Sequence, residues 1–297
     1  MTKSAFHAAA VLLASSGLAG CGAPEEAPAG AAAAGKDTVA ATAAEHAHDA
    51  PAPTPAALAE PAVVVLEQEL AYGESAKSNL VGFLAMPEDA AEPLPGIIVI
   101  HEWWGLNDSI KAMTRRLAGE GYVALAVDLY GGVTAETPEA AQALMADPDA
   151  ARNNLRQAYD YLETYALAPR IATIGWSLGG GYSLETALEY PGELDAMVMY
   201  YGPVEVDRNR LAALNVPVLG FFGAEDASIP VRDVQEFRAT LMELGKTAEV
   251  LIVPRVGHAF ANPSGGNYSE QAANESWATT RAFLERHLKV ATPTAVR

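Results

Sequence analysis

A glycine-flanked serine, Ser177, stands between two sequence patterns of different period. Residues 171–174 form an apolar run typical of a buried strand, and residues 178–190 form a helical pattern. A sharp turn between them needs the small residues of the sequence Gly-Trp-Ser-Leu-Gly at 175–179, because neighbouring main chains would otherwise clash. The pattern predicts that the Ser177 hydroxyl projects above a sheet, at a helix N-terminus that favours a developing oxyanion. A glycine-rich turn without chemistry is the alternative interpretation.

Strand and helix patterns alternate from residue 63 onward. Two short apolar runs, at 63–66 and 80–84, flank a turn region and predict an antiparallel hairpin. Such alternation is typical of a mostly parallel sheet with helices on both faces, so the predicted fold class is α/β. Further strands are predicted at 97–100, 122–127, 171–174, 196–200, 216–222 and 250–253, and helices at 108–119, 138–146, 149–166, 178–190, 230–244 and 269–288.

The N-terminal residues 1–20 have the pattern of an export signal, with Lys3 before a short apolar segment. The sequence Leu-Ala-Gly-Cys that ends at Cys21 resembles the lipobox of bacterial lipoproteins, which implies cleavage before Cys21 and acylation of its thiol. Two or three acyl chains anchor a protein stably, whereas one does so only marginally. We therefore expect a lipid-anchored protein of the cell envelope. Gly22 favours the outer membrane, facing the periplasm or the exterior; an ordinary signal with a spare thiol is the alternative.

Residues 21–62 are poor in side chains that build a core. From residue 22 onward they hold 18 Ala, six Pro and three Gly among 41 residues, with no aromatic. Such a segment cannot bury enough apolar surface to offset its ordering entropy, so we predict a disordered tether. His46, His48 and Asp49 could chelate a metal weakly, but a tract without further ligands argues against a metal site. The folded domain is expected at 63–290, followed by a flexible end at 291–297.

The composition excludes some classes of partner. The formal net charge is −18, from 19 Lys and Arg against 37 Asp and Glu, which argues against nucleic-acid binding because phosphates need a basic face. The single cysteine cannot form an intramolecular disulfide, so packing alone must hold the domain together. The chain has no run of 18 apolar residues, so we expect no membrane-spanning helix in the mature protein. No obligate protein partner is evident.

A serine nucleophile needs a base, and the histidines narrow the choice. His101 and His258 remain once those in the signal, the tether and the C-terminal helix are set aside. His258 follows the last predicted strand in a loop, where a reachable base belongs. Asp226 follows the preceding strand and is expected to fix the tautomer of His258, with Glu225 as the rival acid. The order Ser177, Asp226, His258 is the chain order of α/β-hydrolases.

Five motifs in this order resemble the dienelactone hydrolase family. The similarity covers about residues 63–290 and implies a single-domain α/β-hydrolase fold without a metal or organic cofactor. It also implies that Glu102 contacts the resting nucleophile, and that the backbone N–H groups of Trp103 and Leu178 form the oxyanion hole. A solvated loop acid is the alternative for Glu102. The motifs are His-Glu-Trp-Trp-Gly at 101–105, Asp-Leu-Tyr at 128–130, the Ser177 turn, Tyr-Tyr-Gly at 200–202 and Gly-His-Ala-Phe at 257–260.

The chain departs from the family pattern at three positions. The usual nucleophile of the family is cysteine, and a serine depends more on its base because it has no accessible anion near neutral pH. The family also places two arginines, which clamp a substrate carboxylate, at the positions of Gly132 and Asn262. The resemblance therefore supports a hydrolase but not a dienelactone substrate. Arg255 is the first alternative for a cation in the pocket.

Several aromatic residues flank these motifs. Trp103, Trp104 and Trp176 suggest an aromatic-walled pocket for a flat or apolar acyl or alcohol group, and core packing is the alternative for each. Glu102, Tyr130 and Asn262 are expected in the same pocket. The segment 131–150 follows a strand's carboxyl end and is a candidate partial lid.

These observations predict a lipid-anchored serine esterase or lactonase that acts on a small-molecule substrate through an acyl-enzyme intermediate. A polyester or cutinase-type hydrolase is a second hypothesis, although its secreted examples often carry disulfides. A binding lipoprotein that kept the fold without catalysis is a third. Loss of Ser177 or His258 would be its simplest sign, and both residues are present.

Overall fold

The computed structural model describes most of the chain from residue 58 to residue 289. The predicted signal, Cys21, most of the tether and residues 291–297 lie outside the described residues. Across the described part of the chain, no helix combines the length and the apolar character needed to cross a bilayer. The described residues are 43, 44, 46, 58–76, 78–145 and 147–289.

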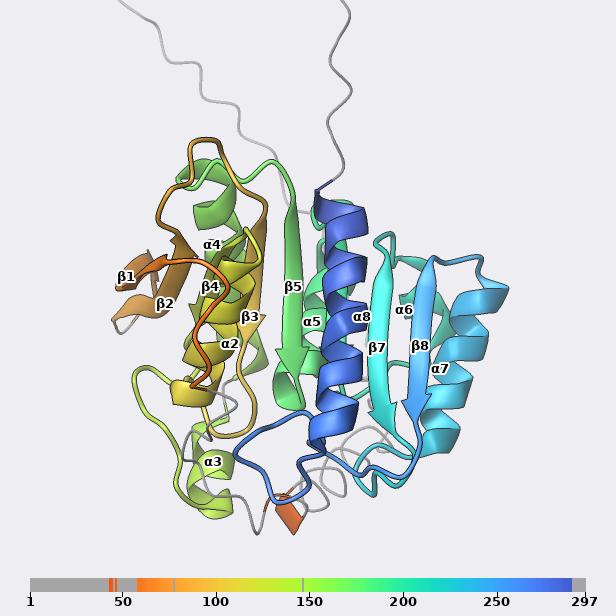
Figure 1. Ribbon diagram of the computed structural model, residues 1–297. Coiled ribbons are helices and arrows are strands. Elements are labelled where there is room, and N and C mark those ends of the chain that lie inside the picture. Colours follow the sequence, from red (N-terminus) through yellow and green to blue (C-terminus); the bar gives the residue numbers. More distant parts are fainter. Residues whose placement is uncertain (1–42, 45, 47–57, 77, 146, 290–297) are drawn as a thin grey trace, which may run out of the picture.

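An eight-stranded sheet forms the centre of the molecule (Figure 1). Its strands are arranged in the order β1-β2-β4-β3-β5-β6-β7-β8. β2 is antiparallel to both of its neighbours, and all other pairs are parallel. The predicted hairpin and the mostly parallel sheet are both confirmed. The strands are β1 (Val65–Glu74), β2 (Asn79–Pro87), β3 (Gly96–Ile100), β4 (Val123–Val127), β5 (Ile171–Trp176), β6 (Ala196–Tyr200), β7 (Val218–Gly223) and β8 (Ala248–Val253).

Helices cover both faces of this sheet. α2 and α8 pack on one face, in front of the sheet in Figure 1, and α4, α5 and α7 pack on the other. α6 was not predicted, because it is a single short turn that depends on the capping carboxylate of Asp207 rather than on an apolar period. The helices are α2 (Asp108–Gly119), α3 (Pro138–Leu144), α4 (Pro148–Thr164), α5 (Leu178–Glu189), α6 (Arg208–Ala212), α7 (Val231–Glu243) and α8 (Glu270–Leu288).

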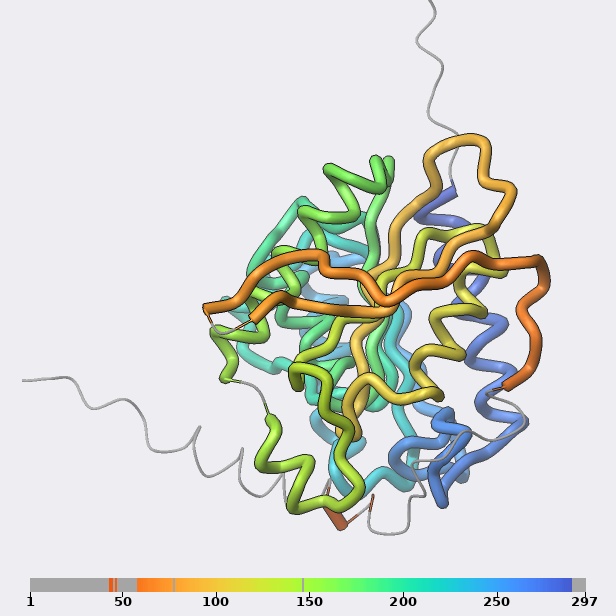
Figure 2. Tube along the Cα trace, turned by 90° about the vertical axis from the view of Figure 1, so that its left-hand side faces the viewer, coloured from red at the N-terminus to blue at the C-terminus, as the bar shows by residue number. Residues whose placement is uncertain are grey.

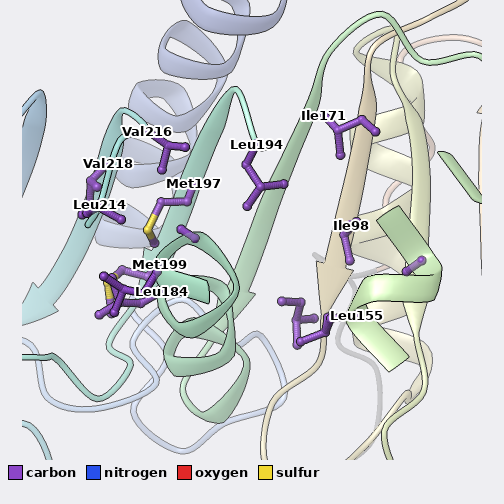
Figure 3. Close-up of a cluster of buried hydrophobic side chains, with 14 of the residues drawn as sticks. Ile98, Leu155, Ile171, Leu184, Leu194, Met197, Met199, Leu214, Val216 and Val218 are labelled. Carbon is purple, nitrogen blue, oxygen red and sulfur yellow. The ribbon is translucent and has the colours of Figure 1, made fainter. Parts of the chain in front are cut away.

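Alternate side chains of the strands enter two apolar cores. In β3, Ile98 joins the core under α4, α5 and α7, whereas Val99 joins the core under α2 and α8. Figure 3 draws part of the first core, where Met197 and Met199 of β6 lie near Leu184 of α5. Because both faces are buried, the strands read in the sequence as continuous apolar runs.

The carboxyl ends of the parallel strands lie along one edge of the sheet, at the bottom of Figure 1. The loops that leave this edge carry the five motifs that resemble the family, because each of these motifs lies at or shortly after the end of a strand. The described residues near position 44, coloured red, lie at the same edge in Figures 1 and 2, close to the chain around α3. This edge is therefore where a site can be assembled.

Candidate active site

Ser177 directly follows β5 and begins α5. Its φ of 50° lies in the left-handed region, which is strained for a residue with a side chain. A Cβ atom on Gly175 would lie 2.0 Å from the carbonyl oxygen of Gly179, and one on Gly179 would lie 2.3 Å from that of Ile100. Only glycine fits at either position. The turn is thereby held tightly against the end of β3.

Three buried side chains form a continuous hydrogen-bonded chain. Oγ of Ser177 lies 2.9 Å from Nε2 of His258, and Nδ1 of His258 lies 2.9 Å from Oδ2 of Asp226. An ionised carboxylate only accepts hydrogen bonds, so we assign the ring proton to Nδ1. Nε2 then presents its lone pair to the serine hydroxyl. These residues, which the sequence predicted as nucleophile, base and acid, are brought together from the ends of three strands.

The surroundings of Asp226 and Glu225 separate the two candidate acids. Asp226 is buried, and its second oxygen, Oδ1, accepts the backbone N–H groups of Ser228 and Ile229, each at 2.8 Å. The side chain of Glu225 is exposed. The hydrogen bonds fix the Asp226 carboxylate in the orientation that His258 requires.

His101 has a different environment from His258. Its Nε2 accepts the N–H of Leu129 at 3.1 Å, so its Nδ1 carries the proton and donates to the carbonyl oxygen of Glu102 at 2.7 Å. Burial lowers the pKa of His101, which keeps the ring neutral. Both nitrogens are engaged by the main chain. His101 therefore ties the loop after β3 to the loop after β4.

Glu102 is buried, and each of its carboxylate oxygens accepts a hydrogen bond from a neutral donor. Oε1 accepts the hydroxyl of Tyr201 at 2.9 Å, and Oε2 accepts the amide of Asn262 at 2.6 Å. The alternative of a solvated loop acid is therefore wrong. The amide of Asn262 is oriented in turn by the N–H of Ser264, which its Oδ1 accepts at 2.9 Å.

Tyr201 belongs to the Tyr-Tyr-Gly motif at 200–202, but no role in the site was predicted for this side chain. It follows β6 with a φ of 38°, and its ring centroid lies 5.1 Å from that of His258. It thus contacts His258 and holds Glu102 at the same time. The available signal was its position, directly after a strand's carboxyl end and before Gly202.

The two predicted oxyanion donors come from two loops: Trp103 follows β3, and Leu178 directly follows Ser177. In the part of the chain that the structure describes, neither the N–H of Trp103 nor that of Leu178 donates to a backbone carbonyl. The carbonyl oxygen of Trp103 accepts the hydroxyl of Tyr130 at 3.2 Å. Asp128 in turn accepts the backbone N–H of Tyr130 at 2.7 Å. Tyr130 therefore acts on the main chain of Trp103, which is a positioning role.

Trp103 and Trp104 pack together in a small cluster with Ala135 and with Ala141 of α3. Described residues of the segment 131–150 therefore pack against these two tryptophans, and a lid role for the segment stays a prediction. The indole Nε1 of Trp103 is buried and has no hydrogen-bond partner among the described residues.

Trp176 lies elsewhere. Its ring stacks on Tyr200 with a centroid separation of 5.6 Å, in the core under α2 and α8. Strand residues alternate between faces, so the side chain before Ser177 is directed into this core. The structure does not bring Trp176 together with Trp103 and Trp104.

Gly132, at the position of a family arginine, and Arg255, the alternative cation, differ in their surroundings. Gly132 has a φ of 90°, and a Cβ placed on it would meet nothing within 4 Å. Arg255 is exposed in a left-handed turn, with a φ of 60°.

Among the described residues there is no group of three His, Cys, Asp or Glu side chains that could hold a metal ion. His48 and Asp49 lie outside the described residues.

A residue of the predicted tether reaches the site. The ring of His46 lies edge-on to that of His258, with centroids 5.3 Å apart. It stacks on Trp103 at 6.2 Å and meets Trp104 edge-on at 5.8 Å. Ala43 packs against the same cluster of tryptophans. This contact was not predicted from the sequence, which indicated a disordered tether.

A comparison with protein families finds a match to the dienelactone hydrolase family over residues 80–288. A Saccharolobus solfataricus protein named "Putative carboxymethylenebutenolidase" is 29% identical over 262 residues, covering 74% of this chain and 99% of the relative. Protein usf of Aquifex pyrophilus is 30% identical over 218 residues, covering 70% of this chain and 93% of the relative. A crystal structure described as "Putative Dienelactone Hydrolase", from Klebsiella pneumoniae, is 29% identical with a TM-score of 0.63, covering 75% of this chain and 99% of that one.

The predicted α/β-hydrolase fold is confirmed by these similarities together with the sheet order. The relatives are matched along almost their whole length, so the resemblance concerns a complete catalytic domain.

Proposed function

The chain belongs to the dienelactone hydrolase family, and we propose that it is a serine hydrolase that cleaves neutral carboxylic esters or lactones. The observation that carries the proposal is the buried chain of hydrogen bonds from Ser177 through His258 to Asp226. A serine beside a base that is itself oriented by a carboxylate is the arrangement of nucleophilic catalysis.

In the first half of the reaction, Oγ of Ser177 attacks the ester carbonyl carbon while Nε2 of His258 takes the hydroxyl proton. Asp226 holds the Nδ1–H tautomer and stabilises the imidazolium that forms. The tetrahedral intermediate then collapses, the bond to the alcohol oxygen breaks, and His258 returns the proton to that oxygen. The products of this half are the free alcohol and an acyl group on Ser177.

In the second half, water attacks the acyl carbon with His258 again as the base. The tetrahedral intermediate then collapses, and the bond between the acyl carbon and Oγ of Ser177 breaks. Oγ regains its proton from His258, and the carboxylic acid leaves. In both halves the oxyanion is stabilised by the N–H groups proposed for this role, those of Trp103 and Leu178. Donors fixed before the reaction stabilise the developing charge without reorganisation.

The surroundings of Glu102 support a neutral substrate. Its buried carboxylate is held by Tyr201 and Asn262, which supply hydrogen bonds but no positive charge. A substrate carboxylate placed nearby would need a cation, or its desolvation would cost several kcal/mol. Neutral esters and lactones avoid that cost.

The lipid anchor at Cys21 is proposed from the sequence alone. The wild type is then expected to partition into detergent and to incorporate labelled fatty acid, whereas Cys21→Ser is expected to give unprocessed or soluble protein. Recovery of the unmodified wild type from the cytoplasm would exclude the anchor.

The experiment for the proposed activity compares the wild type with Ser177→Ala on short-chain neutral esters and lactones. We expect turnover by the wild type. In the variant we expect kcat to fall on the order of a thousandfold or more, because Ser177, His258 and Asp226 act as a unit. A Ser177→Ala variant that keeps near-normal turnover would overturn the proposal.

A further inference from the structure

The site is closed in the arrangement that the structure describes. Ser177 is 3% exposed, His258 is 1% exposed and Trp103 is 2% exposed. A substrate carbonyl must reach within about 3.5 Å of the serine oxygen for attack. Some group that covers these side chains must therefore move before a substrate can enter.

His46 is placed to be that group. It is 1% exposed and contacts the base and both site tryptophans, although it lies 212 residues before His258 in the chain. It also lies N-terminal to residues 80–288, which match the family, so its contact is an addition to the catalytic domain. Ala43 extends the contact onto the tryptophan cluster.

We propose that the segment containing Ala43, Ala44 and His46, which we call the His46 segment, is an intramolecular competitive inhibitor of the active site. The proposal rests on the proposed function, because the site it covers is the ester-hydrolysing site. His46 occupies the space beside His258 and Trp103, and a substrate must displace it.

The contacts of this segment suit a reversible cover. Edge-on and stacked ring pairs are individually weak. Because the segment belongs to the same chain, its effective concentration at the site is high and weak contacts suffice to close it. His46 stacks on Trp103 but accepts no hydrogen bond from its indole N–H, as Nε1 has no partner among the described residues. A substrate oxygen that accepts this N–H gains a hydrogen bond that the cover does not make.

The kinetic test is His46→Ala in the full-length chain. We expect KM for a neutral ester to fall about threefold or more, with kcat unchanged, because the loss of even one of the three ring contacts of His46 is on that scale. Labelling of Ser177 by a fluorophosphonate should accelerate by the same factor. Ala43→Glu, which places a charge against the tryptophans, should act in the same direction.

The matched control is Ala44→Ser. Ala44 belongs to the same segment but is exposed, so its substitution should change neither KM nor the labelling rate. An unchanged or raised KM in His46→Ala, or a lowered kcat, would overturn the proposal, because His46 would then be inert or part of the substrate's own binding surface.

A binding experiment separates this proposal from the proposed function. A fluorescent peptide with the sequence of residues 40–50 should bind the Ser177→Ala/His46→Ala double variant at least threefold more tightly than Ser177→Ala, whose own segment occupies the site. The same peptide with alanine in place of His46 should not bind either protein. This readout needs no turnover. If the peptide binds both proteins equally, the inhibitory role of the His46 segment is overturned, even where the wild type hydrolyses esters. If the peptide binds selectively but the wild type hydrolyses no ester, only the proposed function is overturned.

Discussion

His101 and His258 are both buried at the carboxyl edge of the sheet, and they differ in what they contact. The ring nitrogens of His101 meet main-chain groups of Glu102 and Leu129. Those of His258 meet the side chains of Ser177 and Asp226. Both rings are almost fully buried, so burial does not distinguish them. A histidine bonded to the main chain joins loops together, whereas one bonded to a hydroxyl and a carboxylate is able to move a proton.

The largest expected difference between the two histidines appears when each ring is replaced by the same residue. His258→Gln is expected to lower kcat by roughly 10⁵-fold, because the serine loses its base. His101→Gln is expected to lower kcat less than about tenfold in the protein that remains folded, since no proton passes through that ring. Ester hydrolysis by the two variants, with folding checked by circular dichroism, measures the difference. Equal losses of kcat would contradict the comparison.

A second prediction concerns the partner that gives His258 its role. Asp226→Asn is expected to lower kcat by about 10⁴-fold, because an amide that donates to Nδ1 favours the wrong tautomer. Glu225→Gln is the matched control, since Glu225 is the neighbouring acid and is exposed. Its kcat should stay close to that of the wild type. A large loss in Glu225→Gln together with a small one in Asp226→Asn would reverse the assignment of the acid.

The third prediction concerns stability and pH. Burial lowers the pKa of His101 in the folded protein below its value of about 6.5 in the unfolded chain. Below about pH 6.5 the unfolded chain therefore binds a proton that the folded protein does not, and the free energy of unfolding falls as the pH is lowered. Denaturant melts from about pH 7 to pH 5 should show a shallower decline in His101→Gln than in the wild type.

The same substitution should also lower the free energy of unfolding at neutral pH, by about 1–3 kcal/mol, because buried main-chain groups lose their partners. An identical pH dependence in His101→Gln and the wild type would show that this ring is not the titrating group.

The smallest expected effect concerns the contact between the two histidine loops. Glu102, which follows His101, accepts a hydrogen bond from Asn262, which follows His258. Asn262→Arg adds a charge there, so kcat/KM for an ester bearing a free carboxylate should rise about tenfold relative to its methyl ester. The rise is limited because Glu102 also attracts the new guanidinium. An unchanged ratio at two salt concentrations would show that this position does not face the substrate.

The sheet and its long helices could be predicted because each has a strong local signal. β3 and β5 are buried on both faces and read as apolar runs, and α2 is capped by Asn107, whose side chain accepts the N–H of Ile110. α6 has a capping residue, Asp207, but no apolar period, since it is short and only one of its residues, Leu211, is buried.

Within the site, residues that directly follow strands were predictable, and contacts between distant loops were not. Ser177, Asp226 and His258 each follow a strand end, so the topology brings them to one edge. The contact of His46 joins segments that no local pattern relates. Side chains of β5 alternate between the two faces of the sheet, so Trp176 points to the face opposite that of its neighbours in the strand. Which of the two cores it enters depends on the helices that cover each face, and the sequence did not specify this.

The most direct measurement of the central claim is peptide mass spectrometry after reaction with a fluorophosphonate probe. We expect a single adduct on Ser177 in the wild type, much slower formation of this adduct in His258→Gln, and formation at nearly the normal rate in His101→Gln. An adduct on another residue, or equal labelling in the wild type and in His258→Gln, would contradict this expectation.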